Sequence, residues 1–183
     1  MKGISFRDLR ADEIDVRVST ISEKGVSLLL YKDARVDQDI LDETVGNMNW
    51  QRHHLRDNAN CIVSIYDSEK EEWVEKEDTG TESFTEKEKG LASDSFKRSC
   101  FNWGIGRELY TAPFIWIKAS DINIYTNDKG KLAVKESFYV EKIIIKDKRI
   151  TCLSIKTNTG KRVFVYTEVQ LDGGNEQTNG TSK

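Results

Sequence analysis

Cysteine and histidine are scarce in this chain. Its three cysteines, Cys61, Cys100 and Cys152, are odd in number, widely spaced and without a Cys-x-x-Cys pair. That arrangement gives neither a disulfide framework nor a zinc ribbon, so we expect buried free thiols. The only two histidines, His53 and His54, are adjacent, which on a strand points them to opposite faces, and no third ligand lies at metal-site spacing. We therefore expect no metal site and no cofactor.

Long apolar runs are also missing. No stretch approaches the ~20 residues of a membrane span, and the opening MKGISFRDLRADEID has no apolar core of the kind found in signal peptides. We therefore expect a cytoplasmic protein without membrane contact. The length suits one domain, residues 1–172. The final stretch GGNEQTNGTSK, residues 173–183, has nothing to bury and is expected to be a disordered tail.

The motifs of common nucleotide-dependent and hydrolytic enzymes are not found. Gly104 and Gly106 form a Gly-x-Gly, but they follow an expected helix, and no strand-helix-strand unit surrounds them. The chain has no Gly-x-x-x-x-Gly-Lys-Ser/Thr loop for ATP and no nucleophile elbow. The two glycines instead fit a helix end with close backbone packing.

Charge is distributed unevenly, although the formal net charge is only −3. Residues 67–88 carry ten Asp or Glu against three Lys, and residues 129–162 carry ten Lys or Arg against three Asp or Glu. Clustered carboxylates can hold catalytic metal ions, so a metal-dependent nuclease using segment 67–88 is one alternative. Most of these acids alternate with lysines, however, which is more typical of a solvated surface.

The residue pattern predicts an α+β fold. An N-terminal β-hairpin is followed by an amphipathic helix over 33–45 that ends at Gly46, and then by an antiparallel β-meander. A long helix and further C-terminal strands complete the order. The run Phe114 to Ile117 reads as a buried strand or a tight connector. The expected strands are 15–22, 26–32, 60–67, 71–78, 137–146, 149–157 and 161–169.

The long helix is expected to begin near Ser83 or Thr85, where Glu86 and Glu88 complete possible capping boxes, and to end at Gly104. At about 100° per residue, one stripe of this helix faces the core. That stripe consists of Ala92, Phe96, Cys100 and Trp103. Lys97 and Phe101 lie along its flank and Arg98 points further round, which places both cations at the surface.

Cations recur beside aromatic residues along the chain. Phosphate binding requires Lys or Arg along a groove, and sequence-tolerant binding of single strands adds aromatic rings on which bases can stack. The pattern therefore indicates a nucleic-acid surface, with DNA or RNA left open. The candidates are Lys32 and Arg35 after Tyr31, Arg52 and Arg56 after Trp50, Lys97 and Arg98 with Phe101, and Arg107 near Tyr110.

Residues 78–117, DTGTESFTEKEKGLASDSFKRSCFNWGIGRELYTAPFIWI, closely resemble the signature of Sak-type phage single-strand annealing proteins, in the superfamily named for the eukaryotic mediator Rad-fifty-two. Residues 28–54, LLLYKDARVDQDILDETVGNMNWQRHH, resemble the same family. The resemblance implies an ATP-independent, non-enzymatic protein of recombination and repair in phage-infected bacteria. It also implies an oligomeric ring that holds single-stranded DNA in a positive groove, with the bases left open to a complementary strand.

The resemblance carries over to individual residues. Lys97 and Arg98 match the family's Lys-Arg pair on the groove-lining helix, which implies phosphate contact. Arg35 resembles the family's basic residue just before the second helix-forming segment. A third basic position of the eukaryotic members is Phe101 here, so this ring either stacks on bases or packs between subunits. The expected partners are single-stranded DNA, further copies of the chain, and a single-strand binding protein or exonuclease. The long C-terminal region that recruits other recombination proteins in eukaryotic members is not present in these 183 residues.

Overall fold

The computed structural model describes residues 3–81 and 87–168, and it has an α+β fold with antiparallel strands and two α-helices. The α+β prediction is thus confirmed. A six-stranded sheet has the order β11-β10-β9-β1-β2-β6, and β3-β4-β5 and β7-β8 form two smaller sheets. The strands are β1 Asp15–Ser22, β2 Gly25–Tyr31, β3 Trp50–Leu55, β4 Asn60–Asp67, β5 Glu72–Thr79, β6 Ile115–Lys118, β7 Ile124–Thr126, β8 Leu132–Val134, β9 Phe138–Lys146, β10 Arg149–Thr157 and β11 Arg162–Thr167. The helices are α1 Ala34–Val45 and α2 Lys87–Trp103, with 3-10 turns η1 Ala11–Glu13, η2 Arg107–Thr111 and η3 Ala119–Asp121.

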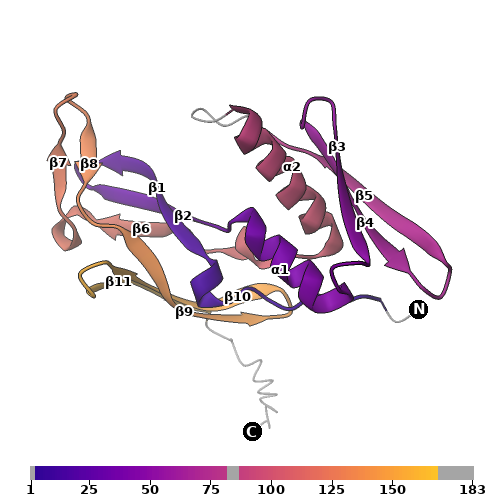
Figure 1. Cartoon of the computed structure of the whole chain (residues 1–183). Helices are drawn as coiled ribbons and strands as arrows, with labels where there is room; N and C mark the ends of the chain where they lie inside the picture. Colours follow the sequence, from indigo (N-terminus) through magenta and orange to yellow (C-terminus); the bar gives the residue numbers. More distant parts are fainter. Residues whose placement is uncertain (1–2, 82–86, 169–183) are drawn as a thin grey trace, which may run out of the picture.

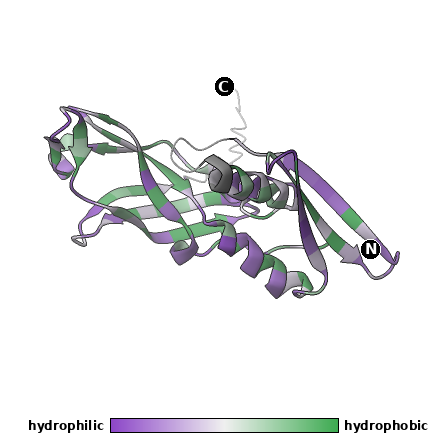
Figure 2. Cartoon of the chain, turned by 45° about the horizontal axis from the view of Figure 1, so that its top comes forward, coloured by the Kyte–Doolittle hydropathy of each residue, from purple (hydrophilic) through white to green (hydrophobic). Residues whose placement is uncertain are grey.

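The chain builds an elongated molecule with the large sheet at one end and the β3-β4-β5 sheet with α2 at the other (Figure 1). Helix α1 lies between them. Its ribbon is mostly hydrophilic, whereas the strands of the large sheet mix hydrophilic and hydrophobic residues (Figure 2). The buried side chains nevertheless form one core that extends through both ends of the molecule.

Helix α2 packs on β4 and β5, as its predicted stripe requires. Phe96 and Cys100 are fully buried, and Trp103 is half-buried and donates its indole N–H to the carbonyl of Val63 at 2.9 Å. Ser95 and Ser99 are also fully buried, which hydrophobicity alone did not indicate. Each hydroxyl donates to a backbone carbonyl, and that bond offsets the cost of burying it.

Helix α1 follows its sequence signals closely. The Asp33 carboxylate accepts the backbone N–H of Arg35 and caps the first turn, as aspartate commonly does at this position. Gly46 ends the helix with φ of 82°, a value that glycine adopts without strain. Ile40 and Leu41 are fully buried, and α1 contacts both α2 and β3.

The expectation of a buried segment at 114–117 is wrong in part. Ile115 and Ile117 of β6 are buried and pair with β2, but Phe114 and Trp116 are exposed and stack on each other with ring centres 6.4 Å apart. Strand β6 lies at the end of its sheet and alternates, so only one of its faces reaches the core.

Two of the three cysteines, Cys61 and Cys100, are buried as expected, whereas Cys152 is half-buried. Burial raises the pKa of the Cys61 thiol to about 11. Within residues 3–81 and 87–168, no helix is long and apolar enough to cross a membrane. The predicted capping residues Ser83, Thr85 and Glu86 and the predicted tail 173–183 lie outside the described residues.

Candidate nucleic-acid interface

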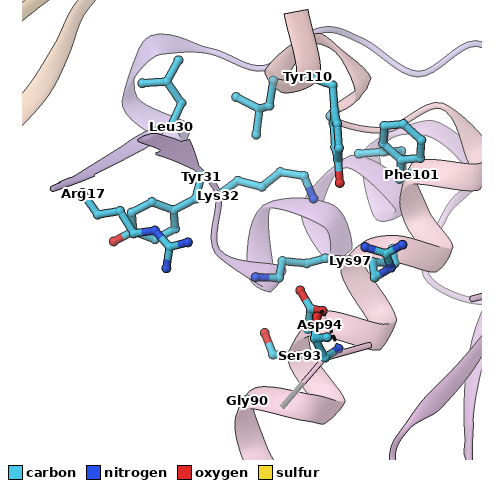
Figure 3. Close-up of a pocket in the computed structure, with 15 residues that line it drawn as sticks. Arg17, Leu30, Tyr31, Lys32, Gly90, Ser93, Asp94, Lys97, Phe101 and Tyr110 are labelled. Atoms are coloured by element: carbon cyan, nitrogen blue, oxygen red, sulfur yellow. Dashed lines mark hydrogen bonds between the residues drawn. The ribbon is translucent and has the colours of Figure 1, made fainter. Parts of the chain in front are cut away.

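A groove of about 870 Å³ lies between α2, the turn that follows α2 and the β1-β2 hairpin, at the end of the hairpin away from its turn (Figure 3). Basic and aromatic side chains from these three elements meet in it. One carboxylate, Asp94, and several small and aliphatic residues complete its wall. Its lining includes Arg17, Tyr31, Lys32, Asp94, Lys97, Arg98, Phe101, Gly106 and Tyr110.

Three predicted residues of α2, Lys97, Arg98 and Phe101, all line this groove. The helical period explains their placement, because the buried Phe96 and Cys100 fix the opposite face of the helix. Lys97 is half-buried and Arg98 is exposed, so both charges remain accessible. The Arg98 guanidinium lies 3.4 Å from the Asp78 carboxylate of β5.

Arg17 and Tyr31 also line the groove, although Arg17 was not among the residues predicted from the sequence. In the hairpin register Arg17 lies opposite Leu29, and Tyr31 is two residues beyond Leu29, so all three share one face of the sheet. The Arg17 guanidinium stands over the Tyr31 ring, 5.8 Å from its centre. The polar positions of β1 were visible in the sequence, but their neighbours on β2 depend on the register.

Lys32 lines the floor of the groove but is buried, and its ammonium donates to both oxygens of Asp37, which is fully buried. Burial raises the pKa of the Asp37 carboxyl to about 6, while Lys32 and Lys97 oppose that shift. Because this cation is already paired inside the protein, the geometry does not favour Lys32 as a phosphate ligand. No sequence signal indicated that Asp37, five residues later, would turn back onto it.

Arg35 lies on the exposed surface at the start of α1, where its guanidinium contacts the Asp33 carboxylate at 3.0 Å. Arg35 and, more weakly, Lys97 hold the pKa of Asp33 low, at about 2. Asp33 therefore lies close enough to Arg35 and Lys97 to interact with both charges. Arg35 thus lies near the groove residue Lys97, although Arg35 itself does not line the groove.

Arg52, Arg56 and Arg107 do not line the groove. Arg52 projects from β3 over the Phe96 ring, 4.9 Å from its centre, and Arg56 lies in the β3-β4 turn with φ of 51°. Arg107 donates to the carbonyl oxygens of Phe101 and Asn102 at 2.8 and 2.9 Å, which satisfies the C-terminal end of α2. The structure thus places these three predicted cations outside the groove.

Carboxylates stand beside the groove cations. Asp78 contacts Arg98, and Asp94 lines the groove and accepts both the backbone N–H and the hydroxyl of Thr81 at 2.8 and 3.0 Å. Because Asp33 and Asp37 lie near Lys97 as well, the positive charge of the groove is partly balanced within the chain.

The acidic segment 67–88 was the basis of the nuclease alternative. Among residues 3–81 and 87–168, no group of three or more His, Cys, Asp or Glu side chains is placed to hold a metal ion. On β5 of this segment, Glu75 accepts from Ser64 and Glu77 from Asn60, while Asp78 contacts Arg98. Residues 82–86 of the segment lie outside the described residues.

The basic segment 129–162 supplies none of the groove-lining residues. Several of its charges are paired within the C-terminal strands. The Glu141 carboxylate contacts Arg162 at 2.6 Å and Lys156 at 2.7 Å, and these bonds hold the pKa of Glu141 well below its usual range. Some cations of this segment are therefore paired with a carboxylate of the chain. Fewer of them are free to bind a ligand than the net charge of the segment suggests.

Comparisons of the chain with protein-family models, with curated proteins and with solved structures found no match. A function for the chain therefore rests on the groove and on the resemblance in residues 28–54 and 78–117.

Proposed function

We propose that this chain is an ATP-independent annealing protein of the Sak type, which binds single-stranded DNA and brings complementary strands together in recombination and repair. The observation that carries the proposal is the groove in which Lys97 and Arg98 lie beside Phe101, Arg17 and Tyr31. Both residues of the Lys-Arg pair face a channel, as phosphate contact requires, and aromatic side chains accompany them.

Annealing of this kind needs no catalytic residue. Complementary strands pair spontaneously once they meet, so a protein accelerates the reaction by concentrating them, extending them and neutralising backbone repulsion. Lys97, Arg98 and Arg17 supply accessible positive charge for that purpose. Release of counterions from the DNA drives binding, which therefore weakens as the salt concentration rises.

The proposal includes an oligomeric ring, as the resemblance implies. One groove offers few cations, and the net charge of the chain is −3, so a single copy would hold DNA weakly. Repetition of the groove around a ring multiplies the phosphate contacts without requiring a basic protein. The exposed Trp116 of edge strand β6 and Phe114 just before it give apolar area that a neighbouring copy would cover.

The first test is annealing of two complementary fluorescent oligonucleotides without ATP. We expect wild-type protein to accelerate annealing, and the double variant Lys97→Ala/Arg98→Ala to lose at least about tenfold in DNA affinity, because phosphate contacts dominate binding. The matched control is Lys129→Ala/Lys131→Ala, which removes the same charge from exposed positions outside the groove. Circular dichroism and light scattering check that each variant keeps its fold and its oligomer.

Two results would overturn the proposal. No acceleration by the wild type at any salt or protein concentration would exclude annealing. Cleavage of labelled DNA in magnesium or manganese, abolished by substitution of carboxylates in segment 67–88 and without annealing, would establish the nuclease alternative. Competition between DNA and RNA oligonucleotides tests whether the groove prefers DNA.

A further inference from the structure

We propose that the groove contains a stacking slot for an unpaired nucleobase, formed by Tyr110 on one side and the Arg17–Tyr31 pair on the other. This inference rests on the proposed function and adds base contact to phosphate contact. Figure 3 shows Tyr31 with Arg17 and Tyr110 with Phe101 on opposite sides of the groove, with Lys97 between them. A slot of this kind would contact the flat faces of a base and leave its pairing edge open to a complementary strand.

The Tyr110 side of the slot is a layered support. Tyr110 is 73% exposed, and its ring centre lies 4.7 Å from that of Phe101. The Arg107 guanidinium lies 5.4 Å from the Phe101 ring centre and is bonded to two carbonyl oxygens at the end of α2. Phe101 therefore supports Tyr110 directly, while most of the Tyr110 surface remains open to a ligand.

The opposite side comes from the β1-β2 hairpin. Tyr31 is 40% exposed and Arg17 is exposed as well. Guanidinium planes and tyrosine rings both stack on nucleobases. Arg17 and Tyr31 share one face of a paired hairpin, so the register of β1 and β2 places both side chains on the same side of the sheet, with the guanidinium over the ring.

Two accessible cations of the groove supply the phosphate contacts. Lys97 and Arg98 line the same groove as the two tyrosines, so one nucleotide can place its phosphate near a cation and its base near a ring. A volume of about 870 Å³ falls in the range of ordinary ligand sites. Every base has a π-face, so we expect stacking here to tolerate any sequence.

The slot distinguishes single strands from duplexes. In a duplex both faces of each internal base are covered by its neighbours, and entry into the slot would require that base to be unstacked and unpaired. An unpaired strand makes no such demand. Tyr110 and Tyr31 are therefore specificity residues, and Lys97 and Arg98 bind any phosphate backbone. Arg17 contributes to both, because its guanidinium carries a positive charge and has a flat face that stacks on a base.

The test compares two probes of equal length and charge, an oligothymidine and an abasic strand, at one salt concentration. We expect wild-type protein to bind oligothymidine about tenfold more tightly, which lies within the range for stacking one base on an aromatic ring. Tyr110→Leu should lose most of this preference and leave binding of the abasic strand unchanged. Tyr110→Phe should keep it, and Tyr125→Leu is the control, since Tyr125 is an exposed tyrosine outside the groove.

A second variant and a second measurement test the slot independently of Tyr110→Leu and of affinity. Tyr31→Leu removes the opposite wall and should also reduce the preference for oligothymidine. A strand that contains 2-aminopurine should lose fluorescence on binding to wild-type protein, because stacking quenches this base, and less so on binding to Tyr110→Leu. Circular dichroism confirms the fold of both variants.

The possible failures are distinguishable. Equal affinity of the wild type for the two probes, or an unchanged preference in folded Tyr110→Leu and Tyr31→Leu, would overturn the slot but leave single-strand binding intact. Absence of binding to both probes would instead overturn the proposed function. Loss of binding to both probes only in Lys97→Ala/Arg98→Ala would support the division between phosphate and base contacts.

Discussion

At the scale of single residues, cations of the groove lie close to carboxylates of their own chain, which partly neutralise them. Arg98 contacts Asp78 at 3.4 Å, and Asp78 also accepts from Asn102 at 3.2 Å. Under the proposed function, a phosphate that enters the groove competes with this carboxylate for the guanidinium, and we expect the acid to lower the affinity of each groove for DNA.

We predict that Asp78→Asn strengthens binding of single-stranded DNA. The substitution keeps the side-chain shape and removes the competing charge, so the Arg98 guanidinium becomes available to a phosphate. The logarithm of the affinity should depend more steeply on the logarithm of salt concentration, by ~0.7 for each additional phosphate that the protein neutralises. Fluorescence anisotropy at four or more salt concentrations measures this slope.

The matched control for that prediction is Asp121→Asn. Asp121 contacts Lys161 at 3.0 Å and does not line the groove, so its removal changes net charge equally without freeing a groove cation. If both variants change the slope alike, Arg98 is not limited by Asp78, and only net charge matters. If Asp78→Asn weakens binding, this carboxylate positions Arg98 rather than competing with DNA.

Individual site residues could be predicted from the sequence where a single helix or strand determines which way the side chain points. Lys97, Arg98 and Phe101 follow from the helical period together with the apolar stripe of α2. The pairing of Lys32 was not predictable, because its partner Asp37 reaches it only after the chain enters α1. Arg17 joins Tyr31 through the register of two strands, which composition does not specify.

At the scale of elements, the turn after α2 determines how Tyr110 and Lys32 are placed. Gly106 precedes η2 with φ of 71°, in the left-handed region. A Cβ atom at this position would lie 2.3 Å from Cε of the buried Lys32 side chain. Glycine therefore allows the turn to pass directly over the Lys32–Asp37 pair.

We predict that Gly106→Ala destabilises the protein by about 2 kcal/mol, from left-handed strain and from displacement of Lys32. Such a loss lowers Tm by about 4–8 °C in a domain of this size. Differential scanning calorimetry measures it. Gly160→Ala is the matched control, because Gly160 has φ of 86° but no atom within 4 Å of the added Cβ. Equal losses in the two variants would show that contact with Lys32 contributes nothing.

Helices and strands could be predicted from the sequence where apolar residues recur at a regular spacing. Both helices, the N-terminal hairpin and the C-terminal hairpins show alternation or a helical stripe, and the turns at 23–24 and 158–160 carry the expected residues. The short strands β7 and β8, of three residues each, carry too few positions to show a period. The run 114–117 was expected to be a buried strand or a tight connector, but the side chains of β6 alternate, so Ile115 and Ile117 reach the core while Trp116 is exposed.

At the scale of the whole molecule, sheet order could not be derived from the sequence. Strands β1 and β9 become neighbours across more than a hundred residues, and a single residue pair, Asp15 with Tyr139, joins them. That one pairing unites the N-terminal hairpin with the C-terminal strands in the large sheet. Local period indicates the elements of such a fold, but long-range packing determines their order.

The weak charge of one groove leads to a prediction about strand length. If copies of the chain present their grooves along one ring, a strand that reaches two grooves binds the second one within the complex, at a high effective concentration. We therefore predict that affinity increases by at least about tenfold when an oligothymidine becomes long enough to span neighbouring subunits. Anisotropy with strands of graded length, at one salt concentration, locates this increase.

Light scattering on the same samples measures the oligomeric state. It therefore separates binding to several grooves of an oligomer from binding to a single groove. An oligomer that binds short strands weakly and long strands tightly is the expected result, because each groove alone has few cations. A monomer whose affinity grows only in proportion to the number of possible binding registers would contradict a shared array of grooves. The double variant Lys97→Ala/Arg98→Ala should retain the oligomer but lose the length dependence, since both side chains lie off the buried stripe of α2.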